Sequence, residues 1–424
     1  MVTAATAQQA WTLEQCIRHA IDNNLSIRLR QDNILQQEIA LSTTQNSRLP
    51  NLSGSAGESF SFGRALTSDN TYANRNTQST NFSLSTSVPI YTGGQISNEI
   101  HVRRLDLQAA LQDCEKARED VTLNVMSAYL EAIYQKDLVA VAERQLELST
   151  MQANRLRVLY ENQKASEADV AQARSAQAQD ELSLTQQRNT YQLALLSLSQ
   201  LLELPSPDDF DVVQPAKTDV ASDVLPSPDA VYSEALGQKP QILAEEFRLK
   251  SAERSVRVAQ SGYFPSLYFS GGLGSSYYKT SGYSTPTFSR QLKDNFNQYV
   301  GLSLSVPIFN RLSTRNNVRA ARLKAHSQEI QLEETRKSLY KDIQQAYYNA
   351  LAAQRQCSSS EVALVASQAA FELMQRKYEN GKATATEYQE ARTNLQKAEA
   401  TDVQARYTYM FRRKILEFYR ESRL

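Results

Sequence analysis

Two long stretches of the chain carry apolar residues at helical spacing and contain almost no glycine or proline. The first covers residues 95–204, and the second runs from 308 to the C-terminus with Gly381 as its single interruption. Leu123, Met126 and Leu130 follow the three-to-four-residue repeat of an amphipathic helix. A helix of about 65 residues would be about 100 Å long. Its apolar stripe must pack against neighbouring helices, so the pattern predicts a bundle or a helical tube.

Each long stretch breaks at one short polar segment. In both stretches the break is followed by an N-cap residue and then, three residues later, by a carboxylate. These features are 161–165 with Ser166 and Asp169, and 379–383 with Thr384 and Glu387. A carboxylate at that spacing is the partner expected in a capping box. We therefore predict two long helical hairpins, at about 94–204 and about 312–420.

Apolar and small polar residues alternate with the period of a β-strand in the segments that precede each helical hairpin. The alternation is strict at 81–88 and 299–306, and the runs 52–63 and 266–278 are strand-like because they are rich in serine, glycine and aromatic residues. Each has roughly the 9–11 residues of a tilted membrane-spanning strand. We predict one β-hairpin at about 52–90 and another at about 266–308, with long polar loops at 64–80 and 279–297.

Two hairpins alone expose edge strands, and unpaired edges are not tolerated in lipid. Four strands per chain can thus form a lipid-embedded barrel only by assembly, and three chains would supply twelve strands. The alternative is a soluble, half-buried antiparallel sheet. Pro89 and Pro307 lack a ladder donor, so we expect them to stop strands at the strand-to-helix transition. The alternative is that each proline simply ends a strand and marks no such transition, and the local sequence fits this alternative equally well.

The whole arrangement occurs twice. The matching segments share an offset of 218 residues and are 160–166 with 378–384, and 87–91 with 305–309. Two short helices precede each β-hairpin, at 12–23 and 25–48, and again at 228–237 and 240–262. We predict a first repeat at 10–204, a linker at 205–225 and a second repeat at 226–424.

Composition narrows the class of function. The 46 basic and 46 acidic side chains balance, so bulk charge does not direct the chain to nucleic acid. No apolar run approaches the roughly 20 residues of a membrane-spanning helix, although alternating strands remain compatible with a membrane. His19, His101 and His326 stand apart, and no nucleophile or phosphate-loop motif is present. We therefore expect no enzyme, no metal site and no cofactor.

The N-terminus lacks the charged and apolar regions of a signal peptide. Residues 5–7, Ala-Thr-Ala, match the small-x-small pattern that precedes a signal-peptidase cut. We interpret the first residues as a remnant of processing, and a disordered polar tail is the alternative.

The duplicated plan, the Ser-Val-Pro-Ile strand ends and the Tyr-Glu-Asn-Gly-Lys-Ala-Thr turn resemble the TolC-type outer-membrane efflux proteins. The resemblance covers nearly the whole chain. It implies an α+β membrane protein, a homotrimer in which a twelve-stranded transmembrane β-barrel joins a long α-helical coiled-coil barrel. It also implies a passive exit duct in the outer membrane of a Gram-negative bacterium, extending into the periplasm. The implied partners are outer-membrane lipid, a periplasmic adaptor (membrane fusion protein) and the inner-membrane transporter of an efflux pump or type I secretion system.

The resemblance also assigns roles to the two hairpin turns, which become the periplasmic tips. Adaptor docking falls on Gln163, Lys164, Ala165, Ser166, Gly381, Lys382, Ala383 and Thr384. The glycine of the family's turn is kept at Gly381 and replaced at Gln163, so the two tips are expected to bind the adaptor unequally. The alternative is an ordinary helix–helix turn.

A periplasmic gate is implied at the same tips. Its acidic positions fall on Glu387 and Glu390, and its latch on Tyr378 and Asp169; the family's basic latch residue falls on Ala383, so that link is absent. Three copies of the glutamates around one axis would favour cations and would raise each other's pKa. The alternative for the glutamates is a solvated helix face. For the whole chain, the alternative is a soluble coiled-coil scaffold that binds proteins along its helices.

Overall fold

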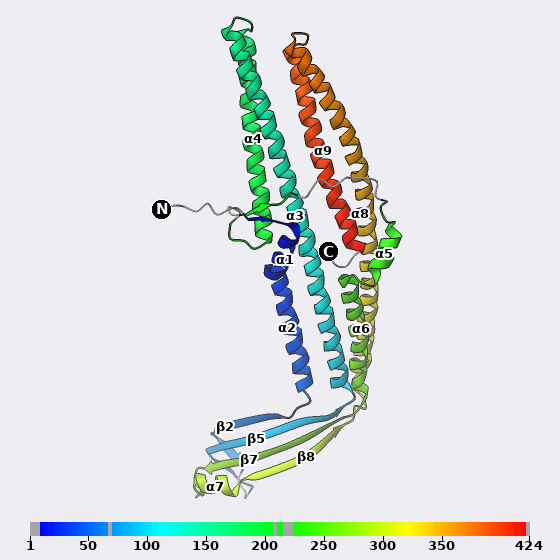
Figure 1. Ribbon diagram of the computed structural model, residues 1–424. Coiled ribbons are helices and arrows are strands. Elements are labelled where there is room, and N and C mark those ends of the chain that lie inside the picture. The colour runs from blue at the N-terminus through cyan, green and yellow to red at the C-terminus, as the bar shows by residue number, and fades with distance from the viewer. Residues whose placement is uncertain (1–8, 67–69, 207–209, 215–223, 421–424) are drawn as a thin grey trace. The chain divides into compact units, whose positions relative to one another are not determined.

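The computed structural model describes residues 9–66, 70–206, 210–214 and 224–420 (Figure 1). The Ala-Thr-Ala pattern at 5–7 and much of the expected linker lie outside these residues. The chain divides into two compact units. The helical unit consists of Met1–Asn33, Leu111–Leu243 and Glu333–Leu424, and the sheet unit of Ile34–Ala110 and Ala244–Leu332. Each unit contains segments from both halves of the chain. The two compact units therefore do not coincide with the two sequence repeats.

The two long helical hairpins are present where the apolar periodicity predicts them. They are α3 (Gln95–Glu161) with α4 (Glu167–Leu201), and α8 (Ser313–Glu379) with α9 (Ala385–Arg420). Both α3 and α8 contain 67 residues, as a duplicated element should. Figure 1 shows both turns at the same end of the helical unit. The second hairpin has its own apolar contacts near the turn, where Phe371, Tyr388 and Leu395 form a buried cluster.

Four shorter helices also agree with the expectation. They are α1 (Leu13–Asn23), α2 (Leu25–Asn46), α5 (Pro228–Leu236) and α6 (Pro240–Gln260). Thr12 forms a capping box with Gln15 at the start of α1, and α5 and α6 each begin with a proline, whose fixed φ suits the first helical turn. None of the helices in the described ranges combines the length and hydropathy of a membrane-spanning helix.

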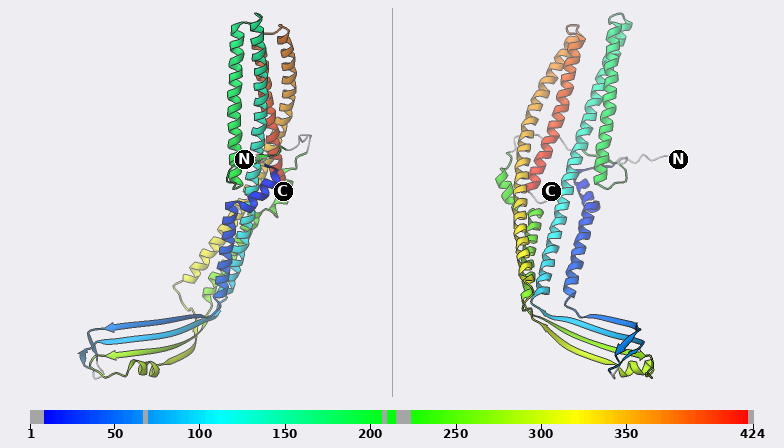
Figure 2. Two further views of the ribbon diagram at one scale, coloured as in Figure 1. Left: turned by 60° about the vertical axis from the view of Figure 1, so that its left-hand side comes forward. Right: turned by 180° about the vertical axis from the view of Figure 1, so that it is seen from behind.

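One antiparallel sheet joins the two predicted β-hairpins. Its strands are β2 (Asn51–Ser61), β5 (Thr77–Thr92), β7 (Ser266–Thr280) and β8 (Asn297–Ser305), in the order β2-β5-β7-β8. The hairpins meet through β5 and β7, which pair antiparallel along nearly their whole length. The strands lie side by side in both views of Figure 2. Among the described residues of this chain, no strand of the sheet pairs with the outer side of β2 or of β8.

The two faces of this sheet differ in chemistry. On the hydroxyl face, Ser53 and Ser85 pair their hydroxyl groups at 3.0 Å, and Ser55 and Ser83 pair theirs at 2.8 Å. On the opposite, apolar face, Leu302 is 67% exposed, and its neighbours in the alternation are also apolar. Strand pleating sends successive side chains to opposite faces, so the cross-strand register places Ser85 and Ser303 on one face and Leu84, Phe269 and Leu302 on the other.

The expected strand stop at Pro89 is wrong. Strand β5 continues through Pro89 to Thr92, and its register with β7 shifts between Pro89 and Tyr91. The shift leaves Ile90 without a register partner, as in a bulge, and a bulge accommodates the missing N–H of proline, so the strand continues instead of ending. At the other transition, β8 ends at Ser305, before Pro307, as expected.

The two expected loops are partly structured. The first contains a small ladder between β3 (Arg64–Leu66) and β4 (Tyr72–Asn74), and the second contains α7 (Phe288–Asp294). The Gln291 amide attaches α7 to β7, because it accepts from the Tyr278 N–H and donates to the Tyr278 carbonyl, both at 2.9 Å.

A further ladder connects the expected linker with the segment before α1. Strand β1 (Gln9–Trp11) pairs in parallel with β6 (Phe210–Val212). The Trp11 ring lies 5.1 Å from the His19 ring and 5.7 Å from the Phe210 ring, so Trp11 is a packing anchor at the start of α1.

Candidate functional site

The turns of the two long hairpins have the same backbone geometry. Gln163 and Gly381 both adopt left-handed φ angles, 60° and 69°. Their N–H groups donate to the carbonyls of Tyr160 and Tyr378, at 2.8 and 3.1 Å, and the next residue of each turn donates five residues back at 2.8 Å. The turn therefore requires positive φ even where the sequence supplies glutamine, which costs roughly 1–2 kcal/mol compared with glycine.

A capping box closes each turn, as the spacing predicts. The Thr384 N–H and hydroxyl donate to the Glu387 carboxylate at 2.7 and 2.8 Å, and the Glu387 N–H donates back to the hydroxyl at 3.2 Å. Ser166 and Asp169 make the same set of bonds. The Thr384 N–H and then its hydroxyl lower the pKa of Glu387. The rise in pKa expected from repulsion between copies stays a prediction, because within one chain the cap acts in the opposite direction.

The expected docking residues form the surface of these turns. All are exposed except Ala165 and Ala383, which are half-buried. They come from equivalent places in the two repeats, so the structure presents two similar surfaces that differ mainly at Gln163 and Gly381.

Tyr378 and Asp169, the expected latch, line one cleft between the two hairpins. This inter-hairpin cleft has a volume of about 300 Å³ and is lined by residues of α3, α4, α8 and α9. The Tyr378 hydroxyl accepts from the Gln152 side chain at 3.2 Å, and its ring stacks on Tyr388 at 4.9 Å. Burial raises the pKa of Tyr378, and the Asp169 charge raises it further. Among the described contacts, the hydrogen-bond partner of Tyr378 is Gln152 and not Asp169.

Arg392 is a further residue of this cleft, and no sequence pattern indicates its role. Its side chain is only 5% exposed, and it forms an ion pair with Asp180, which is 15% exposed. Its guanidinium also donates to the Gln145 side chain at 3.1 Å and to the Gln145 carbonyl at 2.9 Å. Arg392 lies on α9, and both partners lie on the first hairpin, so the cluster joins the two hairpins. The sequence shows only that arginine recurs at 174 and 392, and Arg174 is exposed.

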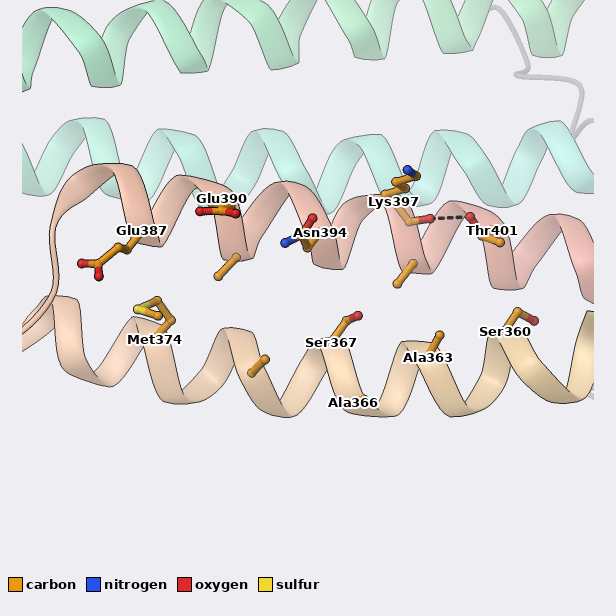
Figure 3. A pocket seen from close by; sticks show the side chains of 13 residues that line it. Ser360, Ala363, Ala366, Ser367, Met374, Glu387, Glu390, Asn394, Lys397 and Thr401 are labelled. Atoms are coloured by element: carbon orange, nitrogen blue, oxygen red, sulfur yellow. Dashed lines mark hydrogen bonds between the residues drawn. The ribbon is translucent and has the colours of Figure 1, made fainter.

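Glu387 and Glu390, the expected gate residues, lie one turn apart at the tip end of a groove between α8 and α9 (Figure 3). This α8–α9 groove has a volume of about 630 Å³. Small side chains, including Ala363 and Ala366, form its α8 wall, and both glutamates are exposed. The structure therefore places the two carboxylates together, as the spacing predicts.

Comparison with known proteins identifies the family. The family described as outer membrane efflux protein matches residues 17–203 and 231–416, one block in each repeat. The chain is 25% identical to outer membrane protein TolC of Escherichia coli (strain K12) over 73% of this chain and 64% of TolC. It is 26% identical to the pyoverdine export outer membrane protein OpmQ of Pseudomonas putida over 77% of this chain and 66% of OpmQ. The chain thus spans just under two thirds of the length of these relatives.

The fold agrees with this assignment. A solved structure of CusC aligns with a TM-score of 0.79 at 18% identity, covering 96% of this chain and 91% of CusC. Both repeats are matched by the family model, and nearly the whole fold is shared with CusC. The chain therefore belongs to the outer membrane efflux protein family.

Proposed function

We propose that this protein is an outer-membrane exit duct, a passive channel that carries drugs or other small molecules across the periplasm and the outer membrane. The observation that carries the proposal is the four-stranded sheet, which has one apolar face, one hydroxyl face and an open edge on each side. An apolar face suits lipid, a hydroxyl face suits a wet lumen, and open edges require further strands.

Three copies would satisfy these requirements. Strand β8 of one copy runs antiparallel to β2, so it can pair with β2 of the next copy. A homotrimer would then close a barrel of twelve strands, an even number typical of bacterial outer-membrane barrels. The six long hairpins would form a helical tube that extends into the periplasm of a Gram-negative bacterium.

The proposed partners follow from the family. A periplasmic adaptor would dock on the turns around Gln163 and Gly381 and would connect the duct to the inner-membrane transporter of a tripartite pump or type I secretion system. The names of the relatives fit this assignment, since OpmQ is a pyoverdine export protein and CusC a cation efflux system protein. A tube selects mainly by size and charge, so the transporter would choose the exported compound.

Glu387 and Glu390 would form the gate. Three copies would bring six carboxylates near one axis, where they attract cations and are screened by salt. Changing both residues to Gln should lower cation selectivity in planar bilayers. Glutamine can also serve as a capping-box partner, so the change at 387 should remove charge without unfolding the turn. Identical reversal potentials for parent and variant would remove the gate from the proposal and leave the duct in place.

The latch has a separate test. Tyr378→Phe removes the hydroxyl that accepts from Gln152, and Asp169→Asn removes the neighbouring charge. Each should loosen the tip and raise single-channel conductance relative to the parent. Unchanged conductance in both variants would show that these residues do not hold the tip.

The duct itself is tested by function in cells and in bilayers. Expression in a Gram-negative strain that lacks its own efflux duct should restore drug resistance, and the purified protein should conduct ions in planar bilayers. A soluble, non-conducting protein that leaves resistance unchanged would favour the alternative, a coiled-coil scaffold.

A further inference from the structure

Helix α7 packs on the apolar face of the sheet, at the end where loops join the strands (Figure 1). The Phe288 ring, at the start of the helix, lies 5.1 Å from the Tyr277 ring and 6.5 Å from the Phe82 ring. The Ser275 hydroxyl donates to the Leu292 carbonyl at 2.6 Å. The strand register places Phe82, Ser275 and Tyr277 on the apolar face, so the helix covers this face and not the hydroxyl face.

The outward side of α7 carries two cations. A helical turn has 3.6 residues, so the residues that contact the sheet, Phe288, Gln291 and Leu292, share one side of the helix. Arg290 and Lys293 lie on the opposite side, and both are exposed. Asp294 pairs with Arg290 at 3.5 Å, but the two side chains are 59% and 76% exposed, so this ion pair is weak. Helix α7 therefore presents a net positive side away from the sheet.

A third cation lies beside α7 on the apolar face of the sheet. Lys279 is exposed and pairs with Gln78 in the strand register, two residues or about 7 Å along the strand from Tyr277. Glu58 lies on the same face, and its carboxylate accepts from the Gln78 side chain at 2.5 Å. Three cations thus surround the outward side of α7, and the two described carboxylates nearby, Glu58 and Asp294, each have a partner.

Two open hollows continue along the apolar face from α7 toward the helical ends of the strands. The nearer hollow has a volume of about 490 Å³ and is lined by Phe82 and Ser275, which also contact α7. The second has a volume of about 580 Å³, and both hollows share Leu84 and Leu273. Along β7 their lining runs from Phe269 to Ser275, about 20 Å, which exceeds the roughly 15 Å thickness of one hydrocarbon leaflet. The hollows are long enough to hold an acyl chain.

We propose that α7 and the two hollows form a binding site for a phosphorylated acyl lipid of the outer leaflet. The inference rests on the proposed duct, in which the apolar face contacts lipid and the loop end of the sheet lies on the outer side of the membrane. Lys279, Arg290 and Lys293 hold the phosphate groups, because ammonium and guanidinium groups form charge-assisted hydrogen bonds with phosphate. The acyl chains lie in the hollows. A cluster of cations favours a head group with more than one phosphate over a zwitterionic one.

The hollows distinguish a lipid from a free phosphate ion as the occupant. The three cations are exposed, so salt and water weaken their hold on a free ion. An acyl chain gains no hydrophobic energy by leaving other lipid, but a chain that fills the hollows gains packing contacts. A phosphate that is attached to such a chain is kept close to the cations, as in any two-point attachment.

Native mass spectrometry of the detergent-extracted particle with added diphosphoryl lipid A tests the head-group contacts. Arg290→Gln with Lys293→Gln should lower the affinity for this lipid about tenfold or more, because each change removes hydrogen bonds to a charged group. The matched control is Arg319→Gln with Arg322→Gln, two exposed cations with the same spacing on α8, which should leave the affinity unchanged. The same spectrum reports the mass of the particle, so a variant that fails to assemble is recognised. Equal affinities for the parent and the α7 variant would overturn the site.

Filling the nearer hollow tests the acyl contacts. Ala56→Phe places a ring in this hollow and should weaken the binding of lipid A several-fold. The control is Gly57→Phe, one residue along on the opposite face, where no heavy atom lies within 4 Å of the added Cβ. Unchanged binding by the Ala56 variant, or displacement of the lipid by inorganic phosphate, would show that the cations alone hold an anion and would overturn the lipid site. A parent that is soluble without detergent and does not conduct would instead overturn the proposed duct.

Discussion

At the scale of single residues, Gly381 and Gln163 occupy the same left-handed position in two equivalent turns. No heavy atom lies within 4 Å of the place where a Cβ would stand at Gly381, so the only cost of a side chain there is backbone strain. A β-branched residue is strained most at positive φ. Gly381→Val should therefore distort the turn and impair export while leaving assembly and membrane insertion intact.

The matched control for this prediction is Gly381→Gln, which copies the residue that the first turn already tolerates. Drug resistance in the complemented strain should fall further for Val than for Gln. Equal, parental resistance for both variants would show that the shape of this turn does not matter for export.

The capping carboxylates predict a pH dependence confined to the tips. The pKa of Asp169 is lowered by the Ser166 hydroxyl and N–H, and that of Glu387 by the Thr384 N–H and hydroxyl. A lowered folded-state pKa means that the stabilisation is present above the unfolded value, about 4, and is lost as pH falls through the folded value. Amide exchange in the first turns of α4 and α9 should therefore speed up at acid pH, after correction for intrinsic rates.

Two variants at one position separate charge from capping. Glu387→Gln keeps a capping partner that does not titrate, so the acid-dependent loss at α9 should disappear. Glu387→Ala should lose protection in that turn at every pH. An acid response in the Gln variant that matches the parent would assign the effect to another group.

The parts of the site that depend on residues close together in the sequence could be predicted, and the contacts between distant residues could not. The capping boxes depend on residues three apart, so Ser166 with Asp169 and Thr384 with Glu387 could be read directly. The Arg392–Asp180 pair joins residues 212 positions apart, and no local pattern indicates which arginine of the repeat is buried. Only the packing of one hairpin on the other decides this.

At the scale of elements, the alternation along β8 places adjacent residues on opposite faces of the sheet. Leu302 lies on the apolar face and Ser303 on the hydroxyl face. A lysine on a lipid-facing strand position costs about 2–4 kcal/mol near the bilayer midplane. Leu302→Lys should therefore reduce the folded fraction in outer-membrane preparations, measured as resistance to unfolding on a semi-native gel, and Ser303→Lys should be tolerated. Equal losses for both would mean that the faces are wrongly assigned.

Helices and strands with strong periodicity could be predicted from the sequence. The exact ends of the strands and the short elements between the main ones could not. The long helices follow from uninterrupted apolar spacing. The prediction that β5 stops at Pro89 was wrong because a bulge can accommodate the backbone N–H that proline lacks while the strand continues. The β1–β6 ladder has only three residues on each side and pairs segments far apart in sequence, so propensity carries no signal for it. Helix α7 is attached through Gln291, whose amide pairs with backbone groups of Tyr278 in the preceding strand, a contact that no spacing rule predicts.

At the scale of the whole molecule, the open edges β2 and β8 predict the number of copies. Native mass spectrometry of the detergent-extracted particle should show three copies of the 47.6 kDa chain. The expectation follows because a closed barrel leaves no unpaired strand edge in lipid. A stable, soluble monomer with its full β content would contradict the assembly.

The pairing of β5 with β7 also sets the order in which the chain can fold. Helices α3 and α4 and the short elements up to α6 separate these two strands in sequence. The first repeat can form its helical hairpin and its β2–β5 pairing early, from its own residues, but the edge of β5 that pairs with β7 must wait for the second repeat to be synthesised. Topologies that depend on distant strand pairing fold slowly and leave strand edges exposed meanwhile. The duplication that gives the protein its symmetry thus creates an interval, during biogenesis, in which an unpaired strand edge must be protected from aggregation.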